Sequence, residues 1–376
     1  MSGRQPSVPG GIAAADFLRR QWQKEALLCR AAIPATSAMP DRAALCALAA
    51  RDDVESRLVV RQRGRWTLSH GPFGAADMKR LPARDWTLLV SGLNLHCDWA
   101  DALLRRFAFI PYARLDDVMA SYAAPGGGVG PHFDSYDVFL LQGFGRRRWR
   151  YGRQADLTLR PGLPLKILQH FAPDHDETLQ PGDMLYLPPH YAHDGVAIDA
   201  CVTYSIGFRA PAAQELGQAF LDFVRDRLQL DGRYEDPHLS PTREPARIGA
   251  DMQRQLRAML EAIAWNADTL ERFVGSFLSE PKADVFFDPP KRLLSRPAFR
   301  VRIARRGVSL DRRTRMLYDA QRFYMNGVES DIADARALVQ LANDRELSPA
   351  ASAALPDAAS DRLHDWYRHG YLAPGT

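Results

Sequence analysis

The segment that decides the fold reads Gly126-Gly-Gly-Val-Gly-Pro-His132-Phe-Asp134. Residues two apart on a β-strand project from the same face of the sheet. We therefore expect the imidazole of His132 and the carboxylate of Asp134 to point into one space. Many strands carry a His-x-Asp pair and bind no metal. The glycine-rich approach and a returning strand further along the chain favour a metal site here.

A second histidine from a distant strand would complete a ligand set. The candidates lie in Pro188-Pro-His190-Tyr-Ala-His193, after the turn Pro181-Gly-Asp183 and the short apolar run Met184–Leu187. Spacing alone does not choose between His190 and His193. Two histidines and one carboxylate occupy one face of an octahedral iron(II) ion and leave positions open for substrate oxygens and O₂. The sequence thus predicts a non-haem iron(II) centre.

The basic run Arg146–Tyr151 could be a solvated face, a nucleic-acid patch or a strand. As a strand, its alternation places Arg147 on the same side as Trp149 and Tyr151, which should face the barrel interior. A buried guanidinium is costly unless a carboxylate pairs with it, preferably through two parallel hydrogen bonds. A dicarboxylate such as 2-oxoglutarate would supply that partner while its keto-acid end chelates the iron. The alternative is a structural ion pair within the protein.

Composition bounds the class of protein. The 376 residues suit two or three domains, and 46% hydrophobic with 25% charged residues is typical of a soluble globular chain. No apolar run approaches the ~20 residues that a membrane-spanning helix needs. The four cysteines are scattered, which indicates reduced thiols. A net charge of +4 neither demands nor excludes a nucleic-acid partner.

The chain divides into four parts. The polar start lacks the apolar stretch of a signal peptide, so we expect a flexible tail over residues 1–15 and a cytoplasmic protein. Residues 16–211 carry many short β-rich runs between Gly/Pro turns, which favours a barrel or sandwich. The clearest of these runs are Trp86–Val90, Val138–Gln142, Arg148–Tyr151, Met184–Leu187 and Val202–Phe208.

The character changes after the β-rich part. Gln214–Leu228 and Met252–Phe277 have apolar residues at helical spacing. Such helices cannot bury their apolar faces alone, so we expect residues 212–285 to form a helical dimerisation segment. The last part, residues 286–376, predicts a small winged-helix module with Asn326-Gly327 as a hairpin turn. Its expected elements are the strands Arg315–Tyr318 and Arg322–Met325 and the helices Ile332–Ala342 and Ser360–His369.

Three stretches together resemble the signature of the bacterial ribosomal oxygenases of the JmjC/cupin superfamily. They run from Ser121 to Trp149, from Pro181 to His193 and from Tyr204 to Pro211. The resemblance is to the type that hydroxylates an arginine of large-subunit ribosomal protein sixteen, and it is looser in the final module. It implies a mainly β fold with helices: a double-stranded β-helix, a helical dimerisation segment and a winged-helix-like C-terminal domain.

The resemblance also implies site residues. It assigns iron(II) to His132, Asp134 and His193, and it places Arg147 and Ser121 at the co-substrate 2-oxoglutarate. It implies no catalytic residue beyond the metal ligands. The reaction would consume O₂ and 2-oxoglutarate and give 3-hydroxyarginine, succinate and CO₂. One departure is Phe144, which stands where a small or polar residue is expected.

An arginine substrate calls for carboxylates and aromatic rings at the mouth of the pocket. Asp116, Asp117, Asp137 and Tyr136 are the candidates, although capping of a helix or turn explains Asp116 and Asp117 equally well. Two alternatives remain open. The same chemistry could act on a histidine or other residue of a different protein. A non-catalytic cupin with a winged helix would instead bind nucleic acid through the arginine-rich stretch Arg296–Arg315.

Overall fold

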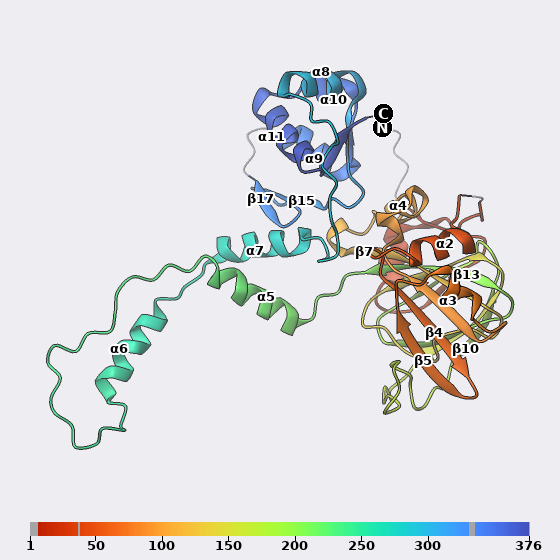
Figure 1. Ribbon diagram of the computed structural model, residues 1–376, viewed down its shortest axis with the longest axis horizontal. Coiled ribbons are helices and arrows are strands. Elements are labelled where there is room, and N and C mark those ends of the chain that lie inside the picture. The colour runs from red at the N-terminus through yellow and green to blue at the C-terminus, as the bar shows by residue number, and fades with distance from the viewer. Residues whose placement is uncertain (1–6, 37, 331–334, 376) are drawn as a thin grey trace.

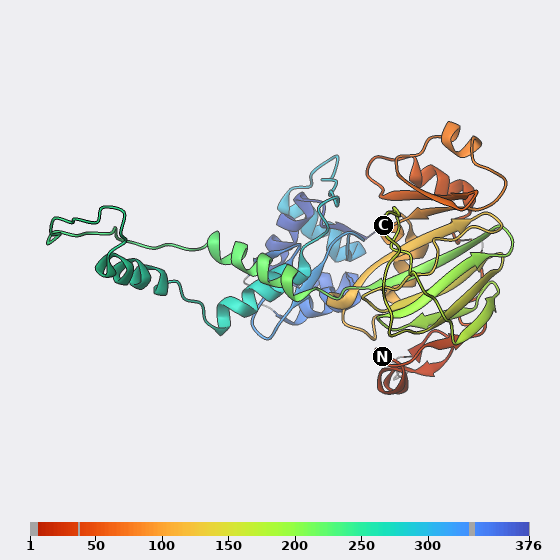
Figure 2. The same cartoon turned by 90° about the horizontal axis from the view of Figure 1, so that it is seen from below.

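A computed structural model describes residues 7–36, 38–330 and 335–375. Figure 1 shows three parts: a β-barrel, a C-terminal domain beside it, and a helical arm that reaches away from both. The same arm extends to one side in Figure 2. No helix in the described ranges is long and apolar enough to cross a bilayer.

The barrel is built from two antiparallel sheets, the expected double-stranded β-helix. The larger has eight strands in the order β3-β11-β8-β13-β7-β6-β4-β5, and the smaller has the order β10-β9-β12. The strands are β3 (Leu27–Cys29), β4 (Ser56–Gln62), β5 (Arg65–His70), β6 (Trp86–Val90), β7 (Leu115–Ala123), β8 (Val138–Phe144), β9 (Arg147–Arg153), β10 (His175–Leu179), β11 (Met184–Leu187), β12 (Tyr191–Ala197) and β13 (Cys201–Phe208). All five strands expected from the sequence form.

Two apolar layers hold this barrel together. One lies between the sheets, where Leu140 and Leu185 of the large sheet pack with Trp149 of the small one. The other covers the outer face of the large sheet with helical residues such as Phe17 and Leu45. Full burial of each such side chain is worth about 1.5–3 kcal/mol. The covering helices are α1 (Ala14–Arg20), α2 (Arg42–Ala49), α3 (Ala75–Lys79) and α4 (Asp98–Arg105).

The prediction of a flexible tail over residues 1–15 is wrong for the residues that the structure describes. Residues 1–6 lie outside the described residues. From there, β1 (Ser7–Val8) pairs with β2 (Ile12–Ala13), and Val8 is buried in the core beside Phe17. The polar composition of the first residues hid this one apolar anchor, and the chain belongs to the fold from Ser7 onward.

The helical arm contains α5 (Ala213–Arg225), α6 (Ala250–Glu261) and α7 (Ala267–Ser279). The stretch Met252–Phe277, expected as one helix, is two. A new N-terminus begins at Asn266, whose side chain accepts a hydrogen bond from the Thr269 backbone N–H at 2.9 Å. Asparagine at this position caps a helix and so favours a fresh start over continuation. In Figures 1 and 2, α6 lies far from the barrel.

The C-terminal domain has two small sheets, ordered β18-β14-β19 and β15-β16-β17. Its elements are α8 (Arg296–Arg306), β14 (Val308–Leu310), β15 (Met316–Tyr318), β16 (Phe323–Met325), β17 (Val328–Ser330), α9 (Ala335–Asp344), β18 (Glu346–Leu347), α10 (Pro349–Ala353), α11 (Asp357–Arg368) and β19 (Leu372–Pro374). Asn326 and Gly327 have φ of 52° and 85°, which confirms the hairpin turn. The expected helix from Ile332 is described only from Ala335.

Helix α8 was not expected from the sequence. It lies in the arginine-rich stretch and buries Phe299 and Ile303 in the domain core. Two of its arginines face α11: Arg300 pairs with Asp361 at 2.9 Å, and Arg296 pairs with the same residue at 3.3 Å. Part of the basic stretch is therefore neutralised within the domain.

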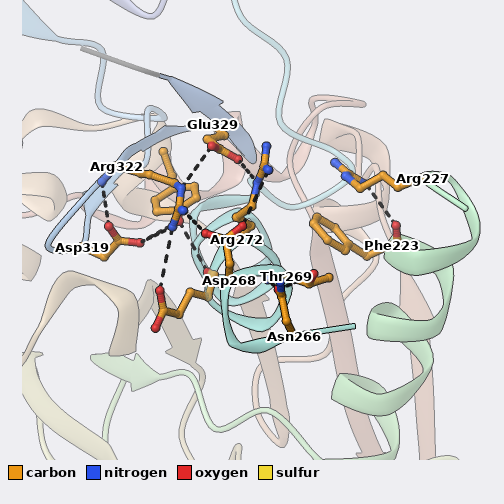
Figure 3. Close-up of polar contacts among 11 residues, drawn as sticks. Phe223, Arg227, Asn266, Asp268, Thr269, Arg272, Asp319, Arg322 and Glu329 are labelled. Carbon is orange, nitrogen blue, oxygen red and sulfur yellow. Dashed lines mark hydrogen bonds and ion pairs between the residues drawn. The ribbon is translucent and has the colours of Figure 1, made fainter. Parts of the chain in front are cut away.

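Helix α7 docks on the β15–β17 sheet, although it precedes the boundary expected at residue 286. Figure 3 shows Arg322, the residue before β16, surrounded by carboxylates, with Asp268 of α7 as an ion-pair partner. Arg272 of α7 also donates to Glu329 of β17 at 2.7 Å. The packing beneath is close, because a Cβ on Gly275 would lie 2.1 Å from the Tyr324 ring.

Candidate metal centre

The metal centre begins with a short backbone pairing between His132 and His193. The N–H of His132 donates to the carbonyl of His193 at 2.9 Å, and the reverse bond is 2.8 Å. This is an isolated bridge, so the expected regular strand through His132 and Asp134 does not form. The bridge joins the glycine-rich segment to β12 and brings the two imidazoles together, with ring centroids 4.2 Å apart.

The donor atoms of His132, Asp134 and His193 all lie within 4.8 Å of one another. No other group of three or more His, Cys, Asp or Glu side chains in the described ranges meets this condition. His190 is not part of the group: it is exposed beside the Phe133 ring, and its backbone N–H donates to the Asp134 carbonyl at 2.8 Å. The structure thus brings together the three residues that the resemblance implied.

The protonation of both histidines suits a metal. Nδ1 of His132 lies 2.9 Å from the carbonyl oxygen of Gly130, and Nδ1 of His193 lies 3.0 Å from that of Tyr191. A carbonyl only accepts, so in the neutral ring Nδ1 carries the proton and Nε2 keeps its lone pair. Burial, reinforced by the neighbouring His132, lowers the pKa of His193 and keeps it neutral. Two such Nε2 atoms and one carboxylate are the ligands that iron(II) oxygenases use.

Arg147 lies on β9 and points into the space between the sheets. Only 3% of it is exposed, and its guanidinium donates to the hydroxyl of Ser121 at 3.0 Å and to the Ser121 carbonyl at 3.1 Å. Its Nε has no hydrogen-bond partner within residues 7–36, 38–330 and 335–375. No carboxylate pairs with it in the part of the chain that the structure describes, so the structural ion pair is wrong. The alternation expected for this strand is confirmed, since Trp149 and Tyr151 are also buried.

One cavity of about 370 Å³ connects these groups. His132, Asp134 and His193 line it together with Arg147 and Ser121. A cationic side chain buried without an anion is unfavourable, whereas an anionic ligand in the cavity would pair with it. The residues therefore fit both an iron(II) ion and a dicarboxylate that spans from the metal to Arg147.

The side chains expected at the pocket mouth differ in their exposure and in their contacts. Tyr136 lines the cavity, and 41% of the residue is exposed. Partial desolvation of its hydroxyl and the adjacent Asp134 carboxylate raise the pKa of Tyr136. Asp116 and Asp117 also line the cavity, at the start of β7. Both face Lys282, whose Nζ lies 3.2 Å from Asp116 Oδ1 and 3.6 Å from Asp117 Oδ2. Sequence reasoning missed Lys282, because no local motif marks a residue that arrives from a distant part of the chain.

The prediction that Asp137 lies at the pocket mouth is wrong. This residue is fully buried and does not line the cavity. Its carboxylate accepts from the Tyr186 hydroxyl at 2.6 Å, from Gln23 at 3.0 Å and from Arg114 at 3.3 Å. These bonds tie the N-terminal segment to the large sheet, so the role of Asp137 is structural.

Phe144, the departure noted in the sequence, ends β8 away from the cavity. Its side chain is 58% exposed and lines none of the cavity surface. The contacts of this position are made by its backbone, since the Gln142 side-chain amide donates to the Phe144 carbonyl at 2.8 Å. The substitution therefore leaves the pocket unchanged.

Comparisons with known proteins agree with this geometry. Residues 102–216 match a JmjC domain, and residues 262–373 match a ROXA-like winged helix. The chain is 38% identical over 279 residues to ribosomal protein uL16 3-hydroxylase of Escherichia coli K12, which covers 73% of this chain and 74% of that one.

Solved structures give the same result over nearly the whole chain. The X-ray structure of E. coli ycfD matches with a TM-score of 0.84 and 32% identity, over 98% of this chain and 100% of that one. The structure of YcfD, a ribosomal oxygenase, in complex with cobalt and 2-oxoglutarate matches with a TM-score of 0.81 and 34% identity, over 96% and 97%.

Proposed function

This chain belongs to the ribosomal oxygenase family of JmjC-domain proteins, and we propose that it is an iron(II)- and 2-oxoglutarate-dependent hydroxylase of a large-subunit ribosomal protein. The observation that carries the proposal is the buried Arg147, which has no carboxylate partner among the described residues and shares one cavity with the His132, Asp134 and His193 set. A metal site alone would suit many reactions. A metal site with a buried cation awaiting an anion is specific to an acidic co-substrate.

The division of labour follows from the residues. His132, Asp134 and His193 would hold iron on one face and leave its other positions free. The bound iron and 2-oxoglutarate supply the activation of O₂, which protein side chains do not provide. In sum, one C–H bond of the substrate becomes C–OH, while 2-oxoglutarate and O₂ give succinate and CO₂. One atom of the O₂ enters the new hydroxyl group and the other enters succinate, so no further reductant is needed.

The chain's own contribution is positioning. Arg147 would bind the distal carboxylate of 2-oxoglutarate through its guanidinium, and Ser121 fixes the orientation of that guanidinium through its hydroxyl and carbonyl. The apolar walls between the two sheets, including Leu140 and Trp149, exclude water from the cavity. Dry surroundings strengthen each of these electrostatic contacts.

We propose an arginine as the hydroxylated residue, on the ribosomal protein uL16 that names the E. coli relative. Asp116 and Asp117 present two carboxylates at the cavity mouth, and Tyr136 presents an aromatic ring there. These groups suit a guanidinium, which binds carboxylates through paired hydrogen bonds and stacks on rings. A neutral histidine side chain has a single N–H donor to offer the two carboxylates, whereas a guanidinium has five, which favours arginine over the histidine alternative.

The non-catalytic alternative is disfavoured by two features. A buried Arg147 is expensive to maintain without a ligand. The arginine-rich stretch that would bind nucleic acid is partly paired within its own domain, since Arg296 and Arg300 both contact Asp361. A contact with nucleic acid is therefore not part of the proposal.

We propose that a second copy of the chain covers the helical arm. Many large apolar side chains are exposed on α5, α6 and α7. Their exposure to water would be unfavourable if no partner covered the arm. They include Leu216, Leu221, Met252, Leu256, Met259, Leu260, Leu270 and Val274. The proposed parts are the catalytic domain 16–211, the dimerisation segment 212–285 and the C-terminal domain 286–376, with α7 docked on the last. As a modifier of ribosomal proteins, the enzyme would work in the cytoplasm.

The test of the co-substrate is direct. The purified chain with iron(II) and 2-oxoglutarate should form succinate faster when a uL16 peptide is added. The Arg147→Gln variant should lose this stimulation at low 2-oxoglutarate and regain part of it at high concentration. Equal succinate formation by both proteins at every concentration would reject the assigned anchor.

A further inference from the structure

The metal cavity adjoins a second, larger one. A cleft of about 510 Å³ lies between the barrel and the C-terminal domain, lined from both sides, for example by Asn94 and Arg315. It shares part of its lining with the metal cavity. The shared residues are Glu55, Ser91, Asp116, Asp117 and Lys282. A polypeptide in the cleft would reach the metal by sending one side chain past these residues.

Lys282 stands at this junction. It belongs to the segment between α7 and α8 and carries the only cation among the five shared residues. Its Nζ contacts both Asp116 and Asp117, and Asp117 is held in place by the Gly92 backbone N–H at 3.0 Å. The chain thus places its own ammonium group on the two carboxylates proposed to receive the substrate.

The electrostatics keep this ammonium charged. Burial alone would lower the pKa of Lys282, but the carboxylates of Asp117 and Asp116 outweigh it and raise the pKa. Burial raises the pKa of Asp117, and the adjacent Lys282 ammonium opposes this shift. In the absence of substrate, Lys282 therefore compensates the negative charge of the pocket mouth.

Lys282 is one of several residues that join the two domains. Other contacts join them: Arg315 donates to the Leu115 carbonyl at 3.1 Å, and Tyr112 donates to the Asn343 carbonyl at 3.1 Å. Arg312 also forms an ion pair with Asp98. A purely structural role for the Lys282 contacts is thus duplicated elsewhere.

We infer that Lys282 is an internal competitor for the substrate: it occupies the guanidinium position on Asp116 and Asp117 until an arginine side chain displaces it. This inference rests on the proposed function. A guanidinium binds a carboxylate through two parallel hydrogen bonds, whereas an ammonium is a compact point charge. Arginine therefore displaces Lys282, and a lysine in the substrate gains nothing by the exchange. Because Lys282 weakens the binding of every competing cation by the same factor, only a side chain that binds the two carboxylates more strongly than an ammonium does displaces it.

The first test uses the full chain loaded with cobalt(II) and 2-oxoglutarate, and a fluorescent uL16 peptide with arginine or lysine at the target position. Occupancy of the pocket by Lys282 reduces the apparent affinity for any competing cation. Lys282→Met should therefore bind the arginine peptide and the lysine peptide about fivefold more tightly, with the ratio of the two affinities unchanged. Lys282→Arg should bind both more weakly. Lys166→Met is the matched control, because Lys166 is an exposed lysine that lines the same cavity and forms no ion pair with Asp116 or Asp117.

The second test uses the unmodified chain, so it does not depend on a folded variant. Acetylation of Lys282 by an amine-reactive ester is followed by mass spectrometry, with and without methylguanidinium. Displacement should raise the reactivity of Lys282 and leave that of Lys166 unchanged.

Two results overturn the inference: weaker or unchanged peptide binding by Lys282→Met, or no rise in Lys282 acetylation at saturating methylguanidinium. Neither result touches the oxygenase assignment. If the peptide fails to bind and is not hydroxylated while methylguanidinium still exposes Lys282, the proposed substrate fails and the competitor role stands.

Discussion

The backbones of His132 and His193 exchange two hydrogen bonds, of 2.9 and 2.8 Å, across residues 61 positions apart in the chain. This pairing fixes which histidine joins the metal site, since it aligns the side chain of His193 with that of His132. His190 lies three residues earlier with a φ of 64°, and its ring is outside the site.

Metal binding should follow this geometry. His193→Ala and Asp134→Ala should weaken cobalt(II) binding by more than about 100-fold, because even outer partners of metal ligands are worth about 10–100-fold. His190→Ala should bind cobalt(II) as the unmodified chain does. Titration of cobalt(II) by visible absorption measures both effects. Equal losses in His190→Ala and His193→Ala would mean that the ligand set is wrongly assigned.

Arg147 should govern 2-oxoglutarate and not the metal. Arg147→Gln should raise the Kd for 2-oxoglutarate by about 30-fold or more, since a buried charged contact is worth about 2–5 kcal/mol. Without ligand, the same variant should unfold at a higher temperature, because it removes a buried charge that no carboxylate of the described chain neutralises. Calorimetric titration and thermal unfolding check the two outcomes. A variant that keeps full affinity would contradict the anchor.

Substitutions of Asp116 and Asp137 should have different effects on stability and on the KM for the peptide. Asp137→Asn should cost about 1–3 kcal/mol of stability, because Tyr186 and the half-buried Arg114 both lose a buried charged acceptor. Asp116→Asn should leave stability nearly unchanged and raise the KM for the peptide. Denaturant unfolding and steady-state kinetics distinguish them. A raised KM with unchanged stability in Asp137→Asn would restore that residue to the pocket.

Asp183 should make stability depend on pH. Burial alone would raise its pKa, but hydrogen bonds from the Gln180 and Ala31 N–H groups and from Arg30 outweigh it and lower the pKa. A lowered pKa stabilises the fold above the unfolded-state value of about 4, and this contribution is lost as the pH falls through the folded-state value.

Asp183→Asn should therefore lower the unfolding temperature at pH 7, and the difference from the unmodified chain should shrink as the pH falls below about 4. Thermal unfolding by circular dichroism across this range measures the difference. A constant difference at every pH would show that charge is not the cause.

The helical arm should mediate association. Leu221→Glu should shift the chain from dimer to monomer, since Leu221 is 62% exposed on α5 and its burial would require a partner. Val328→Glu, a similarly exposed position on β17, is the control and should leave the dimer intact. Sedimentation velocity measures both. A monomeric unmodified chain would reject the dimer.

Local patterns were sufficient for much of the fold. The strands Trp86–Val90 and Met184–Leu187 form over the residues expected, because each is a short apolar run bounded by turns. Val8 could not be found in this way, since a single apolar residue carries no periodicity. The break between α6 and α7 depends on one capping residue, Asn266, within an otherwise helical pattern.

The site shows the same division. Arg147 was predictable because alternation along one strand fixes its direction. Choosing His193 over His190 required either the resemblance or the β12 register, since the spacing fits both. Asp137 is the next residue after Tyr136, yet its side chain contacts Tyr186 and Arg114, which come from distant segments of the chain. The sequence does not show these contacts. Lys282 meets Asp116 only through the docking of the C-terminal part, which no local pattern encodes.

The most direct test of the central claim is mass spectrometry of a uL16 peptide after incubation with the chain, iron(II), 2-oxoglutarate and O₂. We expect one added oxygen on the arginine side chain, dependent on 2-oxoglutarate and absent with His193→Ala. An oxygen on a histidine, or succinate formed with the peptide left unmodified, would contradict the proposed substrate. No oxygen incorporation and no succinate would contradict the oxygenase itself.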